Sequence, residues 1–148
     1  MPLTLVANNT IAHLELPSIG YQSGAPKASA EVLLHGATII SWKTQAKERL
    51  FLSSKTPLDG SSAIRGGIPI VFPVFGSPVD HDDGHGLEKL PKHGVARTTA
   101  WKLRQTAQGD GEDEVGASAA MASFTLSSSD ISRAEDVYPW AFGLVYDV

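Results

Sequence analysis

Two short segments carry side chains that could bind an anion, and both are rich in glycine or proline. The first reads RGGIPIVFPVFG over residues 65–76, with Arg65 as its only charged side chain. The second reads PKHGVAR over residues 91–97, and its charged or titratable side chains are Lys92, His93 and Arg97. Arginine presents five donors in a planar fork and stays cationic at physiological pH, which suits a carboxylate or a phosphate. Each segment is therefore a candidate anion site.

The backbone of the segment 63–76 is not typical of an ordinary strand. Its two prolines cannot donate hydrogen bonds to a β-ladder, and its glycines permit conformations that other residues avoid. An apolar run that cannot pair regularly is expected to wall a pocket, with Gly66 and Gly67 letting a neighbour approach the backbone. The alternative is that Arg65 pairs with a structural carboxylate and that the run is a buried crossover.

A third polar cluster reads HDDGHGLE over residues 81–88 and suggests a metal site. Its histidines and carboxylates are metal-ligating types, but no helix fixes their spacing, and the neighbouring glycines favour mobility. We therefore expect a solvated loop there, with no bound metal. The acidic run GDGEDE over residues 109–114 is likewise expected to be a solvated turn between strands.

The bulk properties of the chain are those of an ordinary globular protein. Its 148 residues suit one domain with a real core, and the net charge is -4 with 19% charged and 42% hydrophobic residues. There is no stripe of Lys and Arg that would favour nucleic acid, and no cysteine for a disulfide or a thiolate metal site. No run approaches the roughly 18 apolar residues of a membrane span, so we expect a cytoplasmic protein without membrane partners.

Alternating apolar residues and residues of high strand propensity predict a series of β-strands. The predicted strands cover residues 2–16 with a turn at Asn8 and Asn9, 30–43 with a bulge or bend at Gly36, 48–53, 99–105, 117–127 and 140–148. Apolar positions do not recur at helical spacing over successive turns anywhere in the chain. The sequence therefore predicts an all-β protein with antiparallel strands and many loops.

The last predicted strand has one apolar face, formed by Phe142, Leu144, Tyr146 and Val148. That face needs a sheet to cover it, because side chains two residues apart share one side of a strand. The strand also runs to Val148 with no turn or polar tail after it. We therefore expect either that its partner strands precede it or that a C-terminal portion that would close the sheet is absent from this chain.

The order of these motifs resembles the glucose-6-phosphate 1-epimerases, also called hexose-6-phosphate mutarotases, of the aldose 1-epimerase and galactose mutarotase superfamily. Two long motifs carry the resemblance, namely residues 65–76 and residues 91–97 followed by Trp101. Shorter matches are HGAT at 35–38 with Trp42, LFLS at 50–53, and YPW at 138–140 with Phe142. The resemblance covers essentially the whole chain.

The resemblance implies a twisted antiparallel β-sandwich, of which residues 1–148 would be the N-terminal portion of a single domain. Members interconvert the α and β anomers of an aldose, here a hexose 6-phosphate. A carboxylate takes the proton of the C1 hydroxyl while a protonated imidazole donates to the ring oxygen, and the opened ring recloses from the other face. These are proton transfers on a positioned substrate, so the resemblance implies neither a metal nor a cofactor.

The resemblance also implies roles for four residues of the two motifs. Arg65 and Arg97 match substrate-binding arginines, and two such groups on a phosphate dianion would each contribute roughly 1.5–3 kcal/mol. Lys92 occupies a substrate-binding position where glutamine is usual, and it would act as a point charge. His93 matches a histidine that contacts the sugar hydroxyls and does not transfer the proton.

The chain departs from the family pattern in its catalytic pair. The family's general-acid histidine and general-base glutamate are expected beyond Val148. None of five other titratable residues of this chain lies in the corresponding motifs, namely His13, His35, His81, His85 and Glu135. No residue of this chain is therefore expected to be catalytic. The alternative to an enzyme is a non-catalytic module that binds a sugar phosphate, or an inactive fragment, and the oligomeric state is left open.

Overall fold

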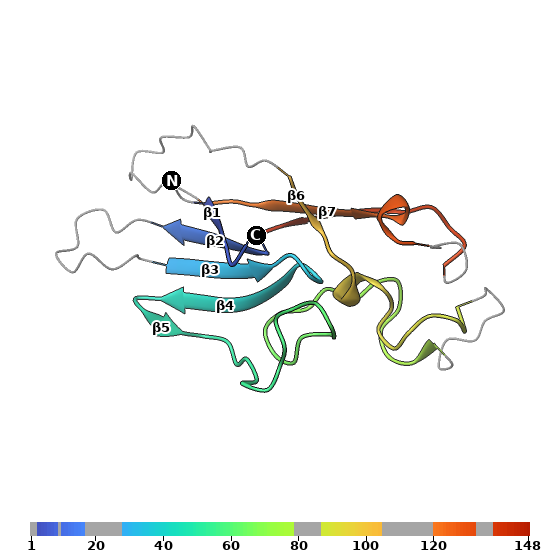
Figure 1. The fold of residues 1–148 in the computed structure, drawn as a ribbon, viewed down its shortest axis with the longest axis horizontal. Coiled ribbons are helices and arrows are strands. Elements are labelled where there is room, and N and C mark those ends of the chain that lie inside the picture. Colours follow the sequence, from blue (N-terminus) through green and yellow to red (C-terminus); the bar gives the residue numbers. More distant parts are fainter. Residues whose placement is uncertain (1–2, 9, 17–27, 79–86, 105–119, 133–137) are drawn as a thin grey trace.

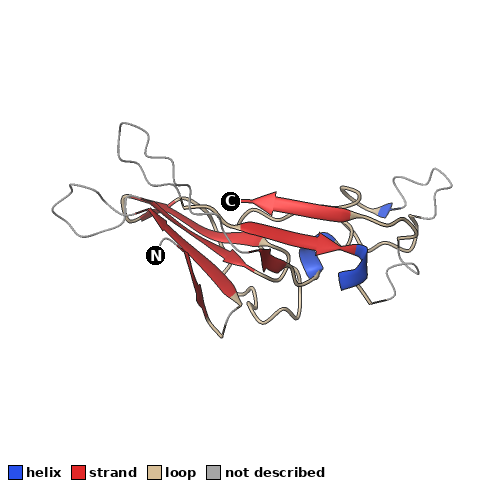
Figure 2. Cartoon of the chain, turned by 90° about the horizontal axis from the view of Figure 1, so that it is seen from above, coloured by secondary structure: helices blue, strands red, loops and turns tan. Residues whose placement is uncertain are grey.

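The computed structural model describes residues 3–8, 10–16, 28–78, 87–104, 120–132 and 138–148. One sheet has the order β1-β2-β3-β4-β5, with β1 at Leu3–Val6, β2 at Ile11–Leu16, β3 at Ala28–Leu33, β4 at Thr38–Thr44 and β5 at Lys47–Glu48. A second sheet has the order β6-β7-β8, with β6 at Lys102–Arg104, β7 at Ser123–Ser127 and β8 at Gly143–Asp147. Figures 1 and 2 show the sheets as two separate groups of strands.

Neighbouring strands are antiparallel throughout both sheets, which confirms the predicted fold class. Helical structure in the described part of the chain includes the short 3-10 turns η2 at Ala96–Thr98 and η3 at Ser128–Asp130, and no α-helix. No helix among the described residues is long and apolar enough to cross a membrane.

The first two strands form the predicted ribbon, with Leu3 opposite Leu14 and Val6 opposite Ile11. Ala7 and Asn8 have positive φ angles of 51° and 56°, as the reversal of direction requires. The other residue of the predicted turn, Asn9, lies outside the described residues. Alternation along the sequence was enough to identify this ribbon.

The stretch predicted as one strand with a bulge or bend at Gly36 is two strands. Positive φ angles of 77° at Gly36 and 44° at Ala37 turn the chain back, so that Leu33 faces Thr38 across β3 and β4. A register shift between Glu31 and Val32 supplies an irregularity elsewhere in β3. The prediction of a single strand was wrong because residues 34–37 hold only one polar side chain, His35, and Gly36 by itself does not distinguish a turn from a bulge.

The prediction of a strand over residues 48–53 was wrong beyond its first residue, since β5 covers Lys47–Glu48 and residues 49–53 form no named strand. The Glu48 carboxylate accepts hydrogen bonds from the Ser41 hydroxyl and from the backbone N–H groups of Trp42, Arg49 and Leu50. Partial burial acts to raise the pKa of Glu48, but these hydrogen bonds lower it to about 2. The Glu48 carboxylate thus takes the N–H groups of Trp42 and Leu50, whereas the Arg49 N–H also donates to the Trp42 carbonyl at 2.8 Å.

The core lies between the two sheets. Ala12, Leu14, Val32 and Ile39 of the large sheet form one cluster with Phe124 and Leu126 of β7 and with Trp101. Packed against that cluster are Phe142, Leu144, Tyr146 and Val148. This confirms the predicted apolar face of the last strand and identifies the sheet that covers it. The arrangement is a β-sandwich.

The opposite face of β3 and β4 is covered too. Leu33 and Ile40 form a second cluster with Ile64, and Ile11 and Leu52 pack against it. Leu52 and Ile64 come from the segment 49–76, which contains single β-bridges and no named strand, whereas Ile11 belongs to β2. Figure 1 shows this segment, coloured from teal to green, leaving β5 and passing below β4 towards the turn that joins β3 to β4.

Several predictions concern residues outside the described part of the chain. These are the metal-ligating cluster with His81 and His85, the acidic turn 109–114, and Glu135. Among the described residues, no group of three His, Cys, Asp or Glu side chains is placed to hold a metal ion.

Candidate functional site

The segment 63–76 is fixed by close contacts between backbones. Ile68 exchanges two hydrogen bonds with Ile39 of β4, at 2.9 and 3.2 Å, and the Gly67 N–H donates to the Phe51 carbonyl at 2.8 Å. A Cβ atom at Gly66 would lie 2.3 Å from the Phe51 oxygen, and one at Gly67 would lie 2.2 Å from the Ile39 oxygen. The neighbour that the two glycines admit is therefore the protein's own backbone.

Arg65 lies on this fixed backbone with its side chain exposed. Its N–H donates to the Thr56 hydroxyl at 3.0 Å, and its carbonyl accepts from the Ser53 N–H at 3.0 Å. Within the described ranges, no carboxylate lies within ion-pair distance of its guanidinium, so the alternative of a structural ion pair has no support there. The exposed guanidinium of Arg65 thus extends from a segment whose backbone is held by hydrogen bonds.

The two candidate anion-binding segments pair directly with each other. Phe72 and Gly94 form a parallel bridge, and the Val95 N–H donates to the Phe72 carbonyl at 2.8 Å. Gly94 has a φ of +73°, and a Cβ atom there would lie 1.9 Å from the Phe72 oxygen. Residues 65–76 and 91–97 are therefore parts of one structural unit.

His93 closes this unit through a reciprocal pair of hydrogen bonds with Gly76. Its backbone N–H donates to the Gly76 carbonyl at 2.8 Å, and its Nδ1 accepts from the Gly76 N–H at 2.9 Å. An accepting Nδ1 requires the tautomer with the proton on Nε2. Burial, followed by the positive charges of Arg97 and Lys92, lowers the pKa of His93, which favours the neutral ring.

This geometry gives His93 a positioning role that the sequence did not reveal. Its φ of +68° is rare for a residue with a side chain, and it aims Nδ1 at Gly76. The Nε2–H makes no hydrogen bond to any part of the chain that the structure describes. It is therefore available to a sugar hydroxyl, and that contact stays a prediction.

Arg97 is held by the short helical turn η2. The buried indole of Trp101 donates to the Ala96 carbonyl at 2.9 Å, and a terminal guanidinium nitrogen of Arg97 donates to the Lys92 carbonyl at 2.9 Å. The Nε of Arg97 is buried and has no hydrogen-bond partner among the described residues. Since an unpaired buried donor is costly, this nitrogen favours a ligand or a water molecule as its partner.

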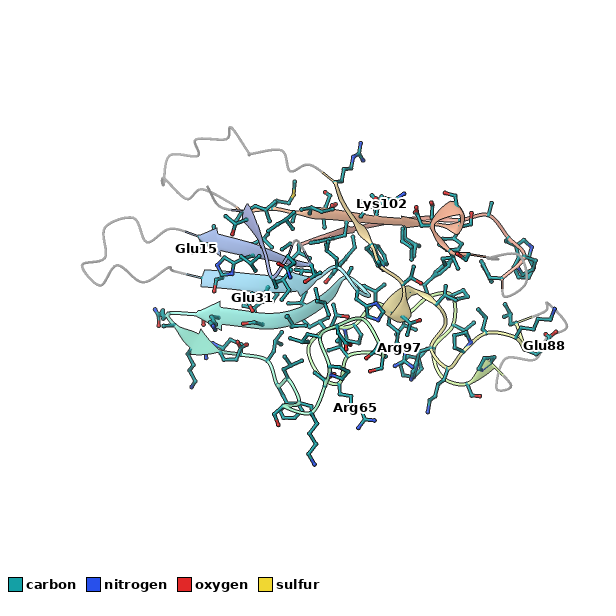
Figure 3. The ribbon with its side chains drawn as sticks, in the orientation of Figure 1. Glu15, Glu31, Arg65, Glu88, Arg97 and Lys102 are labelled. Atoms are coloured by element: carbon teal, nitrogen blue, oxygen red, sulfur yellow. The ribbon has the colours of Figure 1, made fainter. Side chains whose placement is uncertain are left out.

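The segments carrying the two arginines are attached to one hairpin. In the hairpin turn, the Gly36 N–H donates at 2.8 Å to the carbonyl of Thr99, which follows Arg97 by two residues. In β4, Ile39 pairs with Ile68, which follows Arg65 by three residues. The two anchor points are three residues apart, one in the β3–β4 turn and one at the start of β4. Figure 3 shows Arg65 and Arg97 in the same region of the molecule, beside the β3–β4 turn.

Two grooves of the structure lie elsewhere. One of about 470 Å³ is lined by Ile11, Glu31, Ile40, Ser41, Glu48, Leu50, Phe51, Leu52 and Leu58. Another of about 130 Å³ is lined by Leu14, Glu15, Leu16, Ala28, Ser29, Ala30, Trp42, Ala120 and Val148. Neither groove is lined by Arg65, Lys92, His93 or Arg97.

A third sequence motif packs on the same unit. The ring of Phe72 lies 4.8 Å from the ring of Phe142 and 5.6 Å from that of Tyr138, and Tyr138 in turn contacts Trp140 at 5.2 Å. Residues 138–142 thus brace the segment that carries Arg65, from the far end of the chain. Aromatic side chains in a short run were the only signal for this contact.

The remaining described histidines lie apart from the bridge between the two motifs. Nε2 of His13 is 3.4 Å from Glu15, and its Nδ1 is 3.5 Å from Glu31, all on β2 and β3. Nε2 of His35 is buried without a partner in the described part of the chain. Neither arrangement supplies a reason to give these residues a catalytic role.

Residues 21–148 match the sequence profile of a family described as Aldose 1-epimerase. A protein of Salmonella typhimurium (strain LT2) named "Putative glucose-6-phosphate 1-epimerase" is 37% identical over 109 residues, which are 73% of this chain and 32% of that protein. A protein of Cenchrus ciliaris with the same name is 43% identical over 81 residues, which are 54% of this chain and 22% of that protein. The chain spans about a third or less of the length of these curated relatives.

Two solved structures also superpose on this chain. A Salmonella typhimurium protein whose title reads "putative mutarotase" superposes with a TM-score of 0.66 at 29% identity, over 93% of this chain and 38% of that chain. The Slr1438 protein of Synechocystis sp. PCC 6803 also gives a TM-score of 0.66, at 24% identity, over 91% of this chain and 43% of that chain. The second likeness concerns the fold alone.

Proposed function

The chain belongs to the aldose 1-epimerase family, and from that premise we propose that it binds a hexose 6-phosphate as part of an enzyme that interconverts the α and β anomers. The names of the relatives favour glucose 6-phosphate as the sugar. The observation that carries the proposal is the backbone bridge between Phe72 and Gly94. It joins the segment of Arg65 to the segment of Lys92, His93 and Arg97.

Arg65 and Arg97 would bind the phosphate in this proposal. The exposed guanidinium of Arg65 makes no ion pair within the described ranges, and the buried Nε of Arg97 makes no hydrogen bond there. Both groups can therefore engage a dianion without giving up an existing carboxylate partner. Lys92 would add a point charge at the rim, since its side chain is exposed.

His93 would orient the sugar in this proposal. Its neutral ring keeps Nδ1 on Gly76 and leaves the Nε2–H to donate to a sugar hydroxyl. No described residue is assigned to the proton transfers at the C1 hydroxyl and the ring oxygen. The proposed contribution of this chain is therefore binding and orientation, which a proton-transfer reaction needs before acid and base can act.

Titration calorimetry of the chain with glucose 6-phosphate and with glucose tests the binding part of the proposal. We expect Arg65→Ala to weaken glucose 6-phosphate binding roughly tenfold to a hundredfold, because it removes a charge-assisted hydrogen bond to phosphate. Arg104→Ala is the matched control, since Arg104 is an exposed arginine on β6, in the other sheet. Equal losses from both variants, or no binding by the unaltered chain, would contradict the proposal.

Exchange spectroscopy of the glucose 6-phosphate anomers separates binding from turnover. Binding without any acceleration over buffer of the same phosphate content would favour the non-catalytic alternative for this chain. Acceleration would mean that an acid and a base are present among its own residues.

A further inference from the structure

Phe75 is an exposed aromatic ring on a fixed piece of backbone. Its side chain is 75% exposed, although it lies between the bridge at Phe72 and the clamped residue Gly76. Both backbone polar groups of Gly76 are bonded to His93, and the ring of Phe75 contacts the ring of His93 edge-on at 4.9 Å. The ring is thus held in place while much of its surface faces outward.

The surroundings of Phe75 distinguish it from other exposed apolar side chains. Phe51 is 76% exposed and lines the groove with Ile40 and Leu58, and its carbonyl accepts a hydrogen bond from the Gly67 N–H, next to the Arg65 segment. Phe75 instead lies against His93, whose pKa is lowered by burial and by the nearby charges of Arg97 and Lys92. An apolar ring is therefore placed beside a hydrogen-bond donor, His93, and the carbonyl of the adjacent residue Lys92 accepts a hydrogen bond from the Arg97 guanidinium.

This combination matches the two chemically different parts of a sugar phosphate. The phosphate needs cationic donors, and a pyranose ring also has a face formed by its C–H groups. The face of an aromatic ring carries negative charge density, so it attracts the weakly positive C–H groups and shields them from water. A ring that is already ordered loses little conformational entropy on binding.

We propose that Phe75 is a substrate-binding residue whose ring stacks on the apolar face of the hexose, so that the site distinguishes a sugar phosphate from a phosphate alone. This inference rests on the proposed function and adds to it the residue that recognises the sugar ring. The sequence motif contains this residue, but its spacing did not indicate whether the ring faces inward or outward.

The test compares two probes, glucose 6-phosphate and inorganic phosphate, by titration calorimetry. We expect Phe75→Ala to weaken glucose 6-phosphate binding about three- to tenfold while changing inorganic phosphate binding by less than about twofold. Val145→Ala is the control for removing an exposed apolar side chain, since Val145 is 63% exposed on β8 in the other sheet, and it should change neither affinity. Arg65→Ala should weaken both probes, because it removes a contact to phosphate.

A second substitution keeps the test decisive if alanine disturbs the loop. Phe75→Leu retains an apolar side chain without an aromatic face, and the amide resonance of Gly76 reports whether the His93 clamp remains. With that resonance unchanged, loss of glucose 6-phosphate affinity alone supports the inference.

The contrary outcomes are distinct. Equal weakening of both probes by Phe75→Ala and Phe75→Leu would show that the ring acts only by supporting His93, and no change in either would show a plain surface residue. If the unaltered chain binds neither probe, or if Arg65→Ala has no effect, the proposed function itself fails and this inference fails with it.

Discussion

The large sheet and the bridged segments 65–76 and 91–97 differ in what holds their backbones. The strands β2, β3 and β4 are joined by antiparallel ladders with one register shift between Glu31 and Val32, and apolar side chains of these strands fill the space between layers. The bridged segments have single bridges, and glycines lie where a Cβ atom would come within 1.9–2.3 Å of a carbonyl oxygen. The backbone of the large sheet is thus held by packed apolar side chains, whereas the close backbone contacts of the bridged segments require glycines without a side chain.

This difference explains why the residues of the proposed site lie on the bridged segments and not on the regular strands. Backbone that approaches other backbone within van der Waals distance has few alternative positions, so it can hold arginines and a histidine in fixed relation. A regular strand offers only two faces, both of which are buried around β3 and β4. The irregular unit is rigid and exposed at once, which a binding surface requires.

The largest expected effect comes from removing atoms in the regular region. Phe124 of β7 has no exposed surface, so Phe124→Ala should lower the free energy of unfolding by about 3–5 kcal/mol through lost burial and a cavity. Chemical denaturation measures this, with Val145→Ala as the control, because Val145 on β8 is largely exposed. Molecules of the Phe124 variant that remain folded should bind glucose 6-phosphate normally. A cost below about 1 kcal/mol would contradict the assigned core.

In the bridged segments, adding atoms at a glycine should lower both the free energy of unfolding and the binding affinity. Gly94→Ala forces a methyl group towards the Phe72 oxygen at a positive φ, and we expect a loss of about 2–4 kcal/mol together with weaker glucose 6-phosphate binding. Gly143→Ala is the matched control, since no atom lies within 4 Å of its added Cβ, and it should change stability by less than about 0.5 kcal/mol. Similar behaviour of the two variants would remove the contrast between the regions.

The smallest effect concerns the pH dependence of the His93 clamp. The pKa of His93 is lowered in the folded protein, so its stabilising contribution is present above its ordinary value of 6.5 and is lost as pH falls through the folded value. His93→Asn tolerates the positive φ but cannot be protonated. Between about pH 7.5 and pH 5, the unaltered chain should lose more stability than the variant, and its Gly76 amide resonance should titrate.

Comparing the two chains by denaturation cancels the titration of all other groups. Identical pH dependence of both proteins, with no titration at Gly76, would mean that the Nδ1 hydrogen bond does not contribute to the clamp.

The sequence by itself determined the elements whose signal is local. Alternation identified β1 and β2, and it placed Leu144 and Tyr146 on the buried face of β8, because side-chain direction in a strand follows from position alone. The glycines of the segment 63–76 indicated close approach for the same local reason. The sequence motifs also indicated the family, which the sequence profile confirms.

Only the tertiary structure decided which groups meet. It paired Gly67 with β4 and Gly94 with Phe72, directed Nδ1 of His93 to Gly76, and left the ring of Phe75 facing outward. It also made Gly36 a hairpin turn and ended β5 at the Glu48 carboxylate. These outcomes depend on partners that lie far away in the chain or compete for the same backbone donors. Local composition does not encode that competition, because its result depends on which distant backbone arrives.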